Sequence, residues 1–461
     1  MAISSINNFL FEVQRSEPEL VAPAKPTPHE FKQLSDIDDQ ESFRFQIPLI
    51  FFYAQNASME GSDPVKVIKK AISETLVFYY PFAGRLREGP GRKLFVECTA
   101  EGILFIEADA NVTLQQFGDA IQPPYAFLDD VLYNVPNSDG IVNSPLLLIQ
   151  VTRLSCGGFI FAIRFNHTMC DVLGLMQFLT AISEIARGSF APSILPVWQR
   201  AFLNARDPPT VTCRHPEYDQ VIDTKHTTIP LNDMDHCSIF FGSTEISTIR
   251  KTLPIHIRQC SSFDLITACL WRTRTIALQP DPNDEMRLFC VVNLRSKSNS
   301  IPLGYYGNTS IFSAAVTTAA KLCHNPLGYA VELVRKAKGG VTEEYMKSVA
   351  ELMVIKGRPK ITSVRSYAVS DITKLEMENI DFGWGNALFG GFVMIDIAKL
   401  PCSGSFCNRF KNNKGELGTL VSFSLPAPAM ERFVVELDAL IKTKPSNELK
   451  NSKGSFIKSI L

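Results

Sequence analysis

One segment constrains the fold of this chain more than any other. It reads LLLIQVTRLSCGGFIFAIRF (Leu146–Phe165), two apolar runs separated by Gly157-Gly158, a pattern typical of two buried strands joined by a turn. The next apolar stretch, Leu175–Ala186, is hydrophobic nearly all round and stops before Gly188, as a buried helix does. Strands that lead into a buried helix predict a mixed α/β core.

A histidine and an aspartate lie where this strand meets this helix, in the sequence FNHTMCDVLG. His167 follows the apolar strand, and Asp171 comes four positions later. An imidazole at such a junction can accept or donate a proton near neutral pH. A lone buried histidine is more often a packed core residue than a catalyst, so both interpretations stay open. If residues 167–171 formed one helix, the two side chains would share a face and could act as a relay.

A second motif, DFGWG at Asp381–Gly385, is found in the C-terminal half. The pair HxxxD and DFGWG, in a chain of 461 residues, resembles the BAHD family of plant acyl-CoA-dependent acyltransferases. The resemblance covers essentially the whole chain. Further matching stretches are LSDIDDQ (Leu34–Gln40), YYPFAGRLREG (Tyr79–Gly89), ARGSFAPSILPVW (Ala186–Trp198), LGYYGN (Leu303–Asn308) and NPLGYAVELV (Asn325–Val334).

The resemblance implies an O-acyltransferase that uses an acyl-CoA thioester as co-substrate, with no bound cofactor and no metal. The motifs look most like the branch that transfers aromatic acyl groups. We therefore expect benzoyl-CoA as donor and benzyl alcohol, or a similar small primary alcohol, as acceptor. An acetyl-CoA-dependent alcohol acetyltransferase that forms volatile esters is the enzymatic alternative. A catalytically silent relative that serves as a binding module is the alternative of another class.

In the family the histidine of HxxxD is the general base, and the resemblance assigns that role to His167. It also implies that the aspartate points away from the channel and pairs with an arginine. Asp171 is therefore expected to support His167 structurally, with Arg295, in VVNLRSK, as its partner. The DFGWG residues expected to brace the channel are Asp381, Gly383, Trp384 and Gly385.

Two further roles, coenzyme A binding and stabilisation of the oxyanion, rest on less specific sequence signals. The chain has no Gly-rich phosphate loop, but family analogy suggests that Ser261 and Ser262, at the start of a helix, bind coenzyme A. The S-x-x-D pattern there also fits an ordinary helix cap. Acyl transfer needs a hydrogen-bond donor for the developing oxyanion, and Asn308, Trp384 and backbone amides are the candidates.

The resemblance implies two chloramphenicol-acetyltransferase-like domains, each a mixed β-sheet flanked by helices, with a channel between them. We expect the first domain at residues 1–190, with HxxxD, and the second at 237–461, with DFGWG. Residues 191–236 carry Pro, Asp, Thr and His with little periodicity. We interpret this segment as a crossover loop between the domains, because long loops inside compact proteins are usually functional or connecting.

Charge and cysteine content limit the partners. A net charge of −1 at pH 7 provides no basic field for nucleic acid or an anionic membrane. Charged residues interrupt every long apolar stretch, which argues against a membrane span. Eleven cysteines without a CxxC pair favour reduced thiols in a cytoplasmic protein, and we expect a monomer. The terminal Ser459-Ile460-Leu461 resembles an SKL-type signal, so the peroxisome is the alternative compartment.

The chain departs from the family pattern after DFGWG. It reads GGFVMIDIAKL (Gly390–Leu400) where relatives have GGP and small residues, and SFCNR (Ser405–Arg409) where they have an aromatic run. This region lines the channel in the family. We expect any change in substrate choice to arise there.

Overall fold

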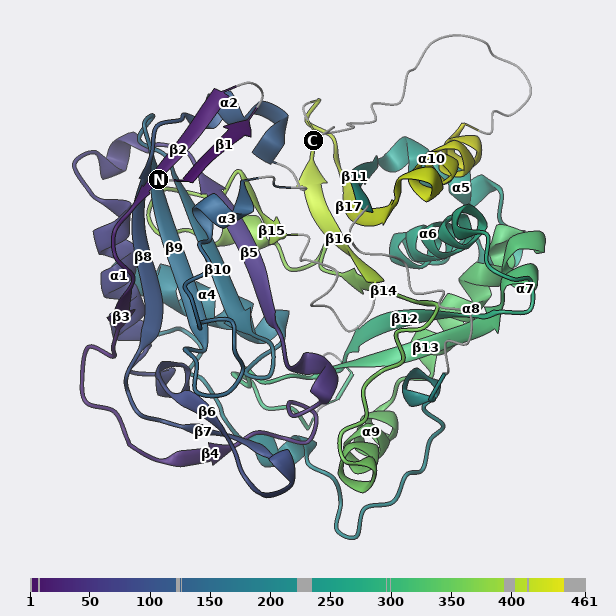
Figure 1. Ribbon diagram of the computed structural model, residues 1–461, viewed down its shortest axis with the longest axis horizontal. Helices are drawn as coiled ribbons and strands as arrows, with labels where there is room; N and C mark the ends of the chain where they lie inside the picture. Colours follow the sequence, from purple (N-terminus) through teal and green to yellow (C-terminus); the bar gives the residue numbers. More distant parts are fainter. Residues whose placement is uncertain are drawn as a thin grey trace.

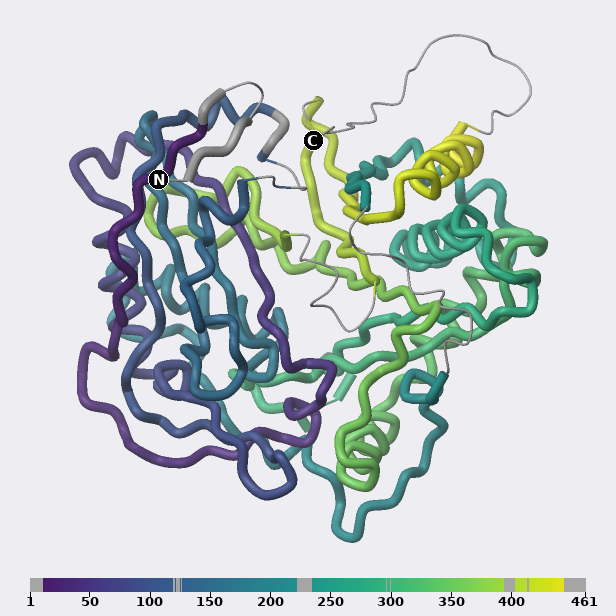
Figure 2. Tube along the Cα trace, in the orientation of Figure 1, coloured from purple at the N-terminus to yellow at the C-terminus, as the bar shows by residue number. Residues whose placement is uncertain are grey.

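Two large β-sheets stand side by side in the computed structural model of the chain, and each is covered by helices (Figure 1). The first half of the chain forms most of one side and the second half most of the other, as the trace in Figure 2 shows. The predicted pair of mixed α/β units is thereby confirmed. The structure describes residues 2–6, 9–121, 125, 127–221, 234–295, 297–298, 300–393, 403–412 and 414–442.

The first sheet has the strand order β1-β2-β8-β9-β10-β5-β15, with β3 beside β8. As predicted, β9 and β10 form an antiparallel pair around the Gly157-Gly158 turn. A small second sheet has the order β4-β7-β6. The strands are β1 (Ala2–Ile6), β2 (Phe9–Arg15), β3 (Glu19–Val21), β4 (Phe31–Gln33), β5 (Gln46–Tyr53), β6 (Arg85–Glu88), β7 (Leu94–Glu97), β8 (Ile103–Ala110), β9 (Leu147–Leu154), β10 (Phe159–Asn166) and β15 (Phe389–Phe392). The helices on this side are α1 (Pro64–Thr75), α2 (Leu114–Phe117), α3 (Leu128–Val131) and α4 (Val172–Ala186).

Both faces of the large first sheet are buried, which explains why its central strands are almost continuously apolar. Along β5, Leu49 and Phe51 belong to the core that contains α1 and α4, whereas Ile50 and Phe52 belong to a second apolar cluster. The second cluster also includes Phe410 from the opposite sheet. The two sheets therefore share an apolar contact, and each buried side chain of this size contributes about 1.5–3 kcal/mol.

Helices α1 and α4 both begin at a capping aspartate. In α1, Asp63 accepts a hydrogen bond from the Val65 N–H at 3.1 Å, and Pro64 occupies the first turn. In α4, Asp171 accepts from the Gly174 N–H at 3.0 Å. The HTMC turn that contains His167 therefore connects the end of β10 directly to the cap of α4.

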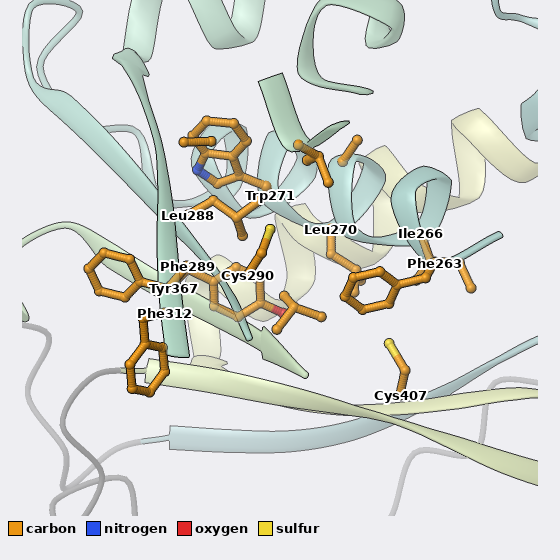
Figure 3. Packing of buried hydrophobic residues seen from close by; sticks show 14 of the residues in the cluster. Phe263, Ile266, Leu270, Trp271, Leu288, Phe289, Cys290, Phe312, Tyr367 and Cys407 are labelled. Carbon is orange, nitrogen blue, oxygen red and sulfur yellow. The ribbon is translucent and has the colours of Figure 1, made fainter. Parts of the chain in front are cut away.

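The other large sheet has the order β11-β17-β16-β14-β12-β13, and β14 is parallel to both of its neighbours. Helix α6 begins at the predicted capping box of Ser261 and Asp264, and its Trp271 packs near Leu288 of β12 (Figure 3). The strands are β11 (Met234–Phe241), β12 (Glu285–Asn293), β13 (Ser310–Thr318), β14 (Ser366–Asp371), β16 (Ser403–Lys411) and β17 (Leu417–Pro426). The helices are α5 (Ser243–Lys251), α6 (Ser262–Leu278), α7 (Ala319–His324), α8 (Leu327–Gly339), α9 (Glu343–Lys356) and α10 (Ala427–Ile441).

One strand from the C-terminal half lies in the first sheet. β15 pairs antiparallel with β5, with Phe389 opposite Phe52 and Phe392 opposite Leu49. The DFGWG motif lies between β14 and β15, on the part of the chain that approaches the first sheet. The domain boundaries at 190 and 236 stay a prediction, but residues after 237 contribute to both large sheets.

Several sequence predictions concern residues outside the described part of the chain. These residues are 222–233 of the crossover segment, 394–400 after DFGWG, and the terminal Ser459–Leu461. Among the described residues of the crossover segment, helical structure is limited to η6 (Arg200–Leu203) and η7 (Pro216–Tyr218). Of the described helices, none has the length and apolarity needed to cross a membrane.

Candidate active site

A cavity of about 360 Å³ lies between the two halves of the chain, and His167 forms part of its wall. This volume is within the usual range for small-molecule sites. The first half of the chain contributes residues from β5, the HTMC turn and the start of α4, and the second half contributes residues from β12, β13, β14 and β16. The aromatic residues of the wall are Phe43, Phe45, Phe263, Phe312, Phe392 and Phe406.

Aromatic rings fix the imidazole of His167. The Phe43 ring, from the short helix η1 (Glu41–Phe43), stacks on it with centroids 4.4 Å apart and planes 5° apart. The Phe45 ring contacts the imidazole edge-on at 5.3 Å between centroids. The backbone N–H of His167 donates to the backbone carbonyl of Phe45 at 3.0 Å. Nδ1 is buried and has no hydrogen-bond partner among the described residues. Burial lowers the pKa of His167, and the nearby carboxylates of Asp171 and Asp38 oppose this shift without reversing it.

The carboxylate of Asp171 is saturated by hydrogen bonds from the second half of the chain. Nη1 of Arg295 lies 2.7 Å from both oxygens, so the predicted pairing is present. Oδ2 also accepts from Asn293 Nδ2 at 3.0 Å and from the Thr309 N–H at 3.0 Å. Burial alone would raise the pKa of Asp171, but Arg295 and the N–H groups of Gly174 and Thr309 hold it below its usual value.

This geometry favours a structural over a relay role for Asp171. Its oxygens are occupied by the cap of α4, by Arg295 and by groups around the start of β13. No hydrogen bond joins it to the His167 ring among the described residues. We infer that Asp171 fixes the turn that carries His167.

The DFGWG residues form a tight turn rather than a reactive group. Asp381 Oδ1 accepts from the N–H groups of Gly383 and Gly385, both at 2.7 Å. Their φ angles are +114° and +88°, a region that side chains disfavour. Arg187, just after α4, donates to the Asp381 carbonyl, and Tyr53 of β5 donates to the Ile380 carbonyl at 2.8 Å. The motif therefore fastens the chain between β14 and β15 onto the first sheet.

Trp384 is wrongly placed for the oxyanion role considered above. Its ring packs edge-on against Phe159, at 5.3 Å between centroids. Phe159 begins β10 and His167 follows the end of that strand, eight residues later. At about 3.3 Å per strand residue the two ends are separated by roughly 25 Å. The indole therefore belongs to the core and cannot donate to a reacting group beside His167.

Asn308 is also unable to fill the oxyanion role. Its Nδ2 donates to Asp38 Oδ1 and to the His167 carbonyl, each at 2.9 Å. An amide nitrogen carries only two hydrogens, so no donor is left for a substrate. Asn308 is fully buried and is not part of the cavity wall. The sequence correctly marked its position near His167 but could not show that its amide was already engaged.

Ser261 and Ser262 lie at the N-terminus of α6, where Ser261 is part of a capping box. Its hydroxyl accepts from the Asp264 N–H at 3.0 Å, and Asp264 accepts from the Ser261 N–H at 3.3 Å. Ser262 is hydrogen-bonded to Arg250 at 3.5 Å. The next residue, Phe263, lines the cavity, so the cap adjoins the site. A role of these serines toward coenzyme A stays a prediction.

Sequence reasoning missed the contribution of the segment around LSDIDDQ. This segment and the residues after it supply Phe43 and Phe45, which hold the imidazole, and Asp38, which anchors Asn308. The sequence signal for this contribution is the LSDIDDQ motif itself. The lysines of the cavity wall were missed as well; they are Lys297, Lys338 and Lys374.

Comparison with known proteins identifies the family of the chain. A model described as "Transferase family" matches residues 11–440. The chain belongs to this family. A "Benzyl alcohol O-benzoyltransferase" of Nicotiana tabacum is 60% identical over 456 residues, 99% of each chain. An "Alcohol acyl transferase 1 allele GSa" of Malus domestica is 52% identical over 461 residues, 98% of this chain and 99% of the relative. The predicted resemblance to BAHD acyltransferases is confirmed, and the chain is an acyltransferase.

Solved structures share the fold. The structure of Vinorine Synthase gives a TM-score of 0.69 at 21% identity and covers 93% of this chain and 98% of that one. The structure of TRI101 of F. graminearum with ethyl coenzyme A gives 0.66 at 15% identity, covering 88% and 97%. At these identities the comparison concerns the two-unit architecture alone.

Proposed function

We propose that this protein transfers an aromatic acyl group, benzoyl above all, from its coenzyme A thioester to benzyl alcohol or a similar small primary alcohol. The observation that carries the proposal is the position of His167 in an apolar, phenylalanine-lined cavity between the two halves. The name of the tobacco relative, at 60% identity over 99% of both chains, supports the choice of substrates.

In the proposed reaction His167 is the general base. Because Nδ1 is buried, Nε2 is the nitrogen that an alcohol in the cavity would meet. Nε2 takes the hydroxyl proton as the alcohol oxygen attacks the thioester carbonyl carbon. The C–S bond of the tetrahedral species then breaks, and the imidazolium returns the proton to the thiolate. The lowered pKa of His167 favours the neutral imidazole, the form that can accept a proton.

Coenzyme A enters this proposal as a co-substrate, with no metal or resident cofactor. Lys297, Lys338 and Lys374 line the cavity. Lys338 is paired with Asp264 at 2.7 Å, and the positive charge of the other two would suit an anionic donor. The solved complex of F. graminearum TRI101 with ethyl coenzyme A supports coenzyme A as the carrier. Ser261 and Ser262, beside the same wall, are proposed contacts.

The rings of the wall support an aromatic substrate. Phe392 and Phe406 are stacked with centroids 4.3 Å apart and planes 7° apart, and Phe406 comes from the segment in which this chain departs from the family pattern. A phenyl group gains free energy from both area burial and ring contacts in such a wall. Acetyl has no ring and gains much less.

We predict that kcat/KM for benzoyl-CoA exceeds that for acetyl-CoA at least about tenfold with benzyl alcohol as acceptor, a difference of ~1.4 kcal/mol. Thiol release measured with a panel of donors and alcohols checks this. If acetyl-CoA is the better donor, the alcohol acetyltransferase alternative, which the apple relative's name supports, replaces the benzoyltransferase.

A pair of variants tests which part of the cavity wall sets the preference for benzoyl-CoA over acetyl-CoA. Phe406→Ala should reduce the ratio between benzoyl-CoA and acetyl-CoA, because it removes a ring from the wall. Phe190→Ala is the matched control, because Phe190 is fully exposed and lies outside the wall. An unchanged ratio in Phe406→Ala would mean that the acyl group does not contact this part of the cavity.

We also predict that no acyl-enzyme accumulates. Cys170 is the nearest thiol in the sequence to His167, but it is fully buried, and burial raises its pKa well above the usual value, so little thiolate forms. Initial-rate lines should intersect as both substrates are varied. Parallel lines, together with acyl label found on Cys170 by mass spectrometry, would instead show a ping-pong mechanism.

We propose that the enzyme acts as a cytoplasmic monomer. A net charge of −1 and cysteines that are free throughout the described part of the chain support a reducing compartment without a nucleic-acid partner.

A further inference from the structure

The turn that carries His167 is held from its buried side by two donors. Asn308 Nδ2 donates to the His167 carbonyl at 2.9 Å and lies 3.4 Å from the Thr168 carbonyl. Arg200 Nη2 donates to the Met169 carbonyl at 2.8 Å. The carbonyls of His167 and Met169 are therefore held by side chains from outside the first sheet and its helices.

Both donors share one carboxylate oxygen. Asp38 Oδ1 accepts from Arg200 Nη1 at 2.9 Å and from both Nδ2 and the backbone N–H of Asn308 at 2.9 Å. The other oxygen accepts from the N–H and hydroxyl of Ser35, at 3.0 and 2.6 Å. Asp38 and Asn308 are completely buried and Arg200 is 3% exposed, so water cannot substitute for these bonds.

The three residues come from distant parts of the chain. Asp38 precedes β5, Arg200 lies in η6 of the crossover segment, and Asn308 precedes β13. The guanidinium lies over the Trp198 ring, with Cζ 4.3 Å from the centroid. A β-carbon at Gly307 would come within 1.6 Å of Arg200 Nη1, so only glycine fits there. The packing leaves the guanidinium little freedom to move.

We propose that Asp38, Arg200 and Asn308 form a positioning clamp on the catalytic turn, separate from the Asp171–Arg295 pair. The clamp acts through the backbone carbonyls of His167 and Met169 and thereby aims the imidazole. The inference rests on the proposed role of His167 as general base. None of the three residues lines the cavity, so the clamp acts on catalysis rather than on substrate binding.

The test is Asn308→Ala, which removes the donor to His167 while the Asp38–Arg200 ion pair remains. We expect kcat to fall by on the order of tenfold to a hundredfold, the usual result of misplacing a catalytic group by about 1 Å. KM for the alcohol and the acyl-CoA should stay within about threefold of the parent. A purely structural residue would not produce this division between kcat and KM.

Gln150→Ala is the matched control. Gln150 of β9 is also completely buried, and its amide donates to the Asp130 carbonyl at 2.8 Å, on a part of the sheet away from the turn. The melting temperature of Gln150→Ala should fall, as that of Asn308→Ala does, but its kcat should stay at the parental value. If both variants lose similar stability and Asn308→Ala keeps kcat within about threefold, the clamp is refuted.

Arg200→Lys covers the case in which Asn308→Ala does not fold. Lysine keeps the charge beside Asp38, but its single ammonium lacks the fork that spans Asp38 and the Met169 carbonyl. We expect a smaller loss of kcat with unchanged KM, whereas parental kcat in a folded protein would overturn the proposal. Ratios to the parent are measured with whichever substrate pair the parent turns over. If the benzoyl assignment is wrong, the parent protein will prefer another acyl donor. If the clamp is wrong, the ratio of variant kcat to parental kcat will stay close to one.

Discussion

Replacing His167 with alanine is expected to lower kcat by roughly two to four orders of magnitude, the usual contribution of a positioned general base. The fold should survive. The imidazole is held by stacking on Phe43 and by contact with Phe45, and its Nδ1 makes no hydrogen bond among the described residues, so no network collapses. Steady-state kinetics and thermal unfolding, measured on the same preparation, separate the two effects.

The pH profile of the parent gives an independent check on His167. A general base works only when neutral, and burial lowers the pKa of this imidazole below its ordinary 6.5. Activity should therefore rise with pH through an acid limb whose midpoint lies below 6.5, and stay level above it. His256→Ala is a suitable control, because His256 is largely exposed and its partner is Glu332. Activity of His167→Ala within about threefold of the parent would exclude the mechanism.

Elements defined by neighbouring residues could be predicted from the sequence. The cap and first turn of α1 follow from Asp63 and Pro64, and the capping box of α6 follows from Ser261 and Asp264. Each depends on a side chain that bonds to the backbone two or three residues away. The strand pair before His167 has the same local character, because the Gly157-Gly158 turn joins apolar runs.

Elements defined by distant contacts could not be predicted. β15 is four residues long and contains two glycines, a poor strand signal, and it is stabilised by its pairing with β5. β13 is rich in small residues and was not recognised, although it carries Phe312 into the cavity wall. The bond from Asn308 to Asp38 spans 270 residues, and it is this bond that makes Asn308 a support instead of an oxyanion donor.

The candidate site shows the same division. His167 was found from a local motif at a strand–helix junction. Arg295 was found only through the family resemblance, because 124 residues separate it from Asp171. The aromatic rings around the imidazole carried no local signal of their role, since a phenylalanine in a buried segment is ordinarily a core residue.

Substitution at the Asp171–Arg295 pair is expected to lower both stability and activity. Asp171→Ala leaves the Arg295 guanidinium in a largely buried site without its carboxylate, and it also removes the cap of α4. Breaking a buried pair in this way typically costs about 3–5 kcal/mol. Both the melting temperature and kcat should therefore fall, because the turn that carries His167 loses its fixed end.

A double-mutant cycle of Asp171→Ala and Arg295→Ala, measured by chemical unfolding, should give a coupling energy of roughly 0.5–3 kcal/mol. The pair Lys70–Glu74 is the control: its side chains are 77% and 42% exposed and its charged atoms lie 3.9 Å apart, so its coupling should be about 0.3–0.5 kcal/mol. Additive effects at Asp171 and Arg295 would show that the ion pair does not stabilise the turn. Loss of activity in Asp171→Ala would then have to come from the lost cap of α4 and the lost bonds to Asn293 and Thr309, or from the relay to His167 that the geometry disfavours.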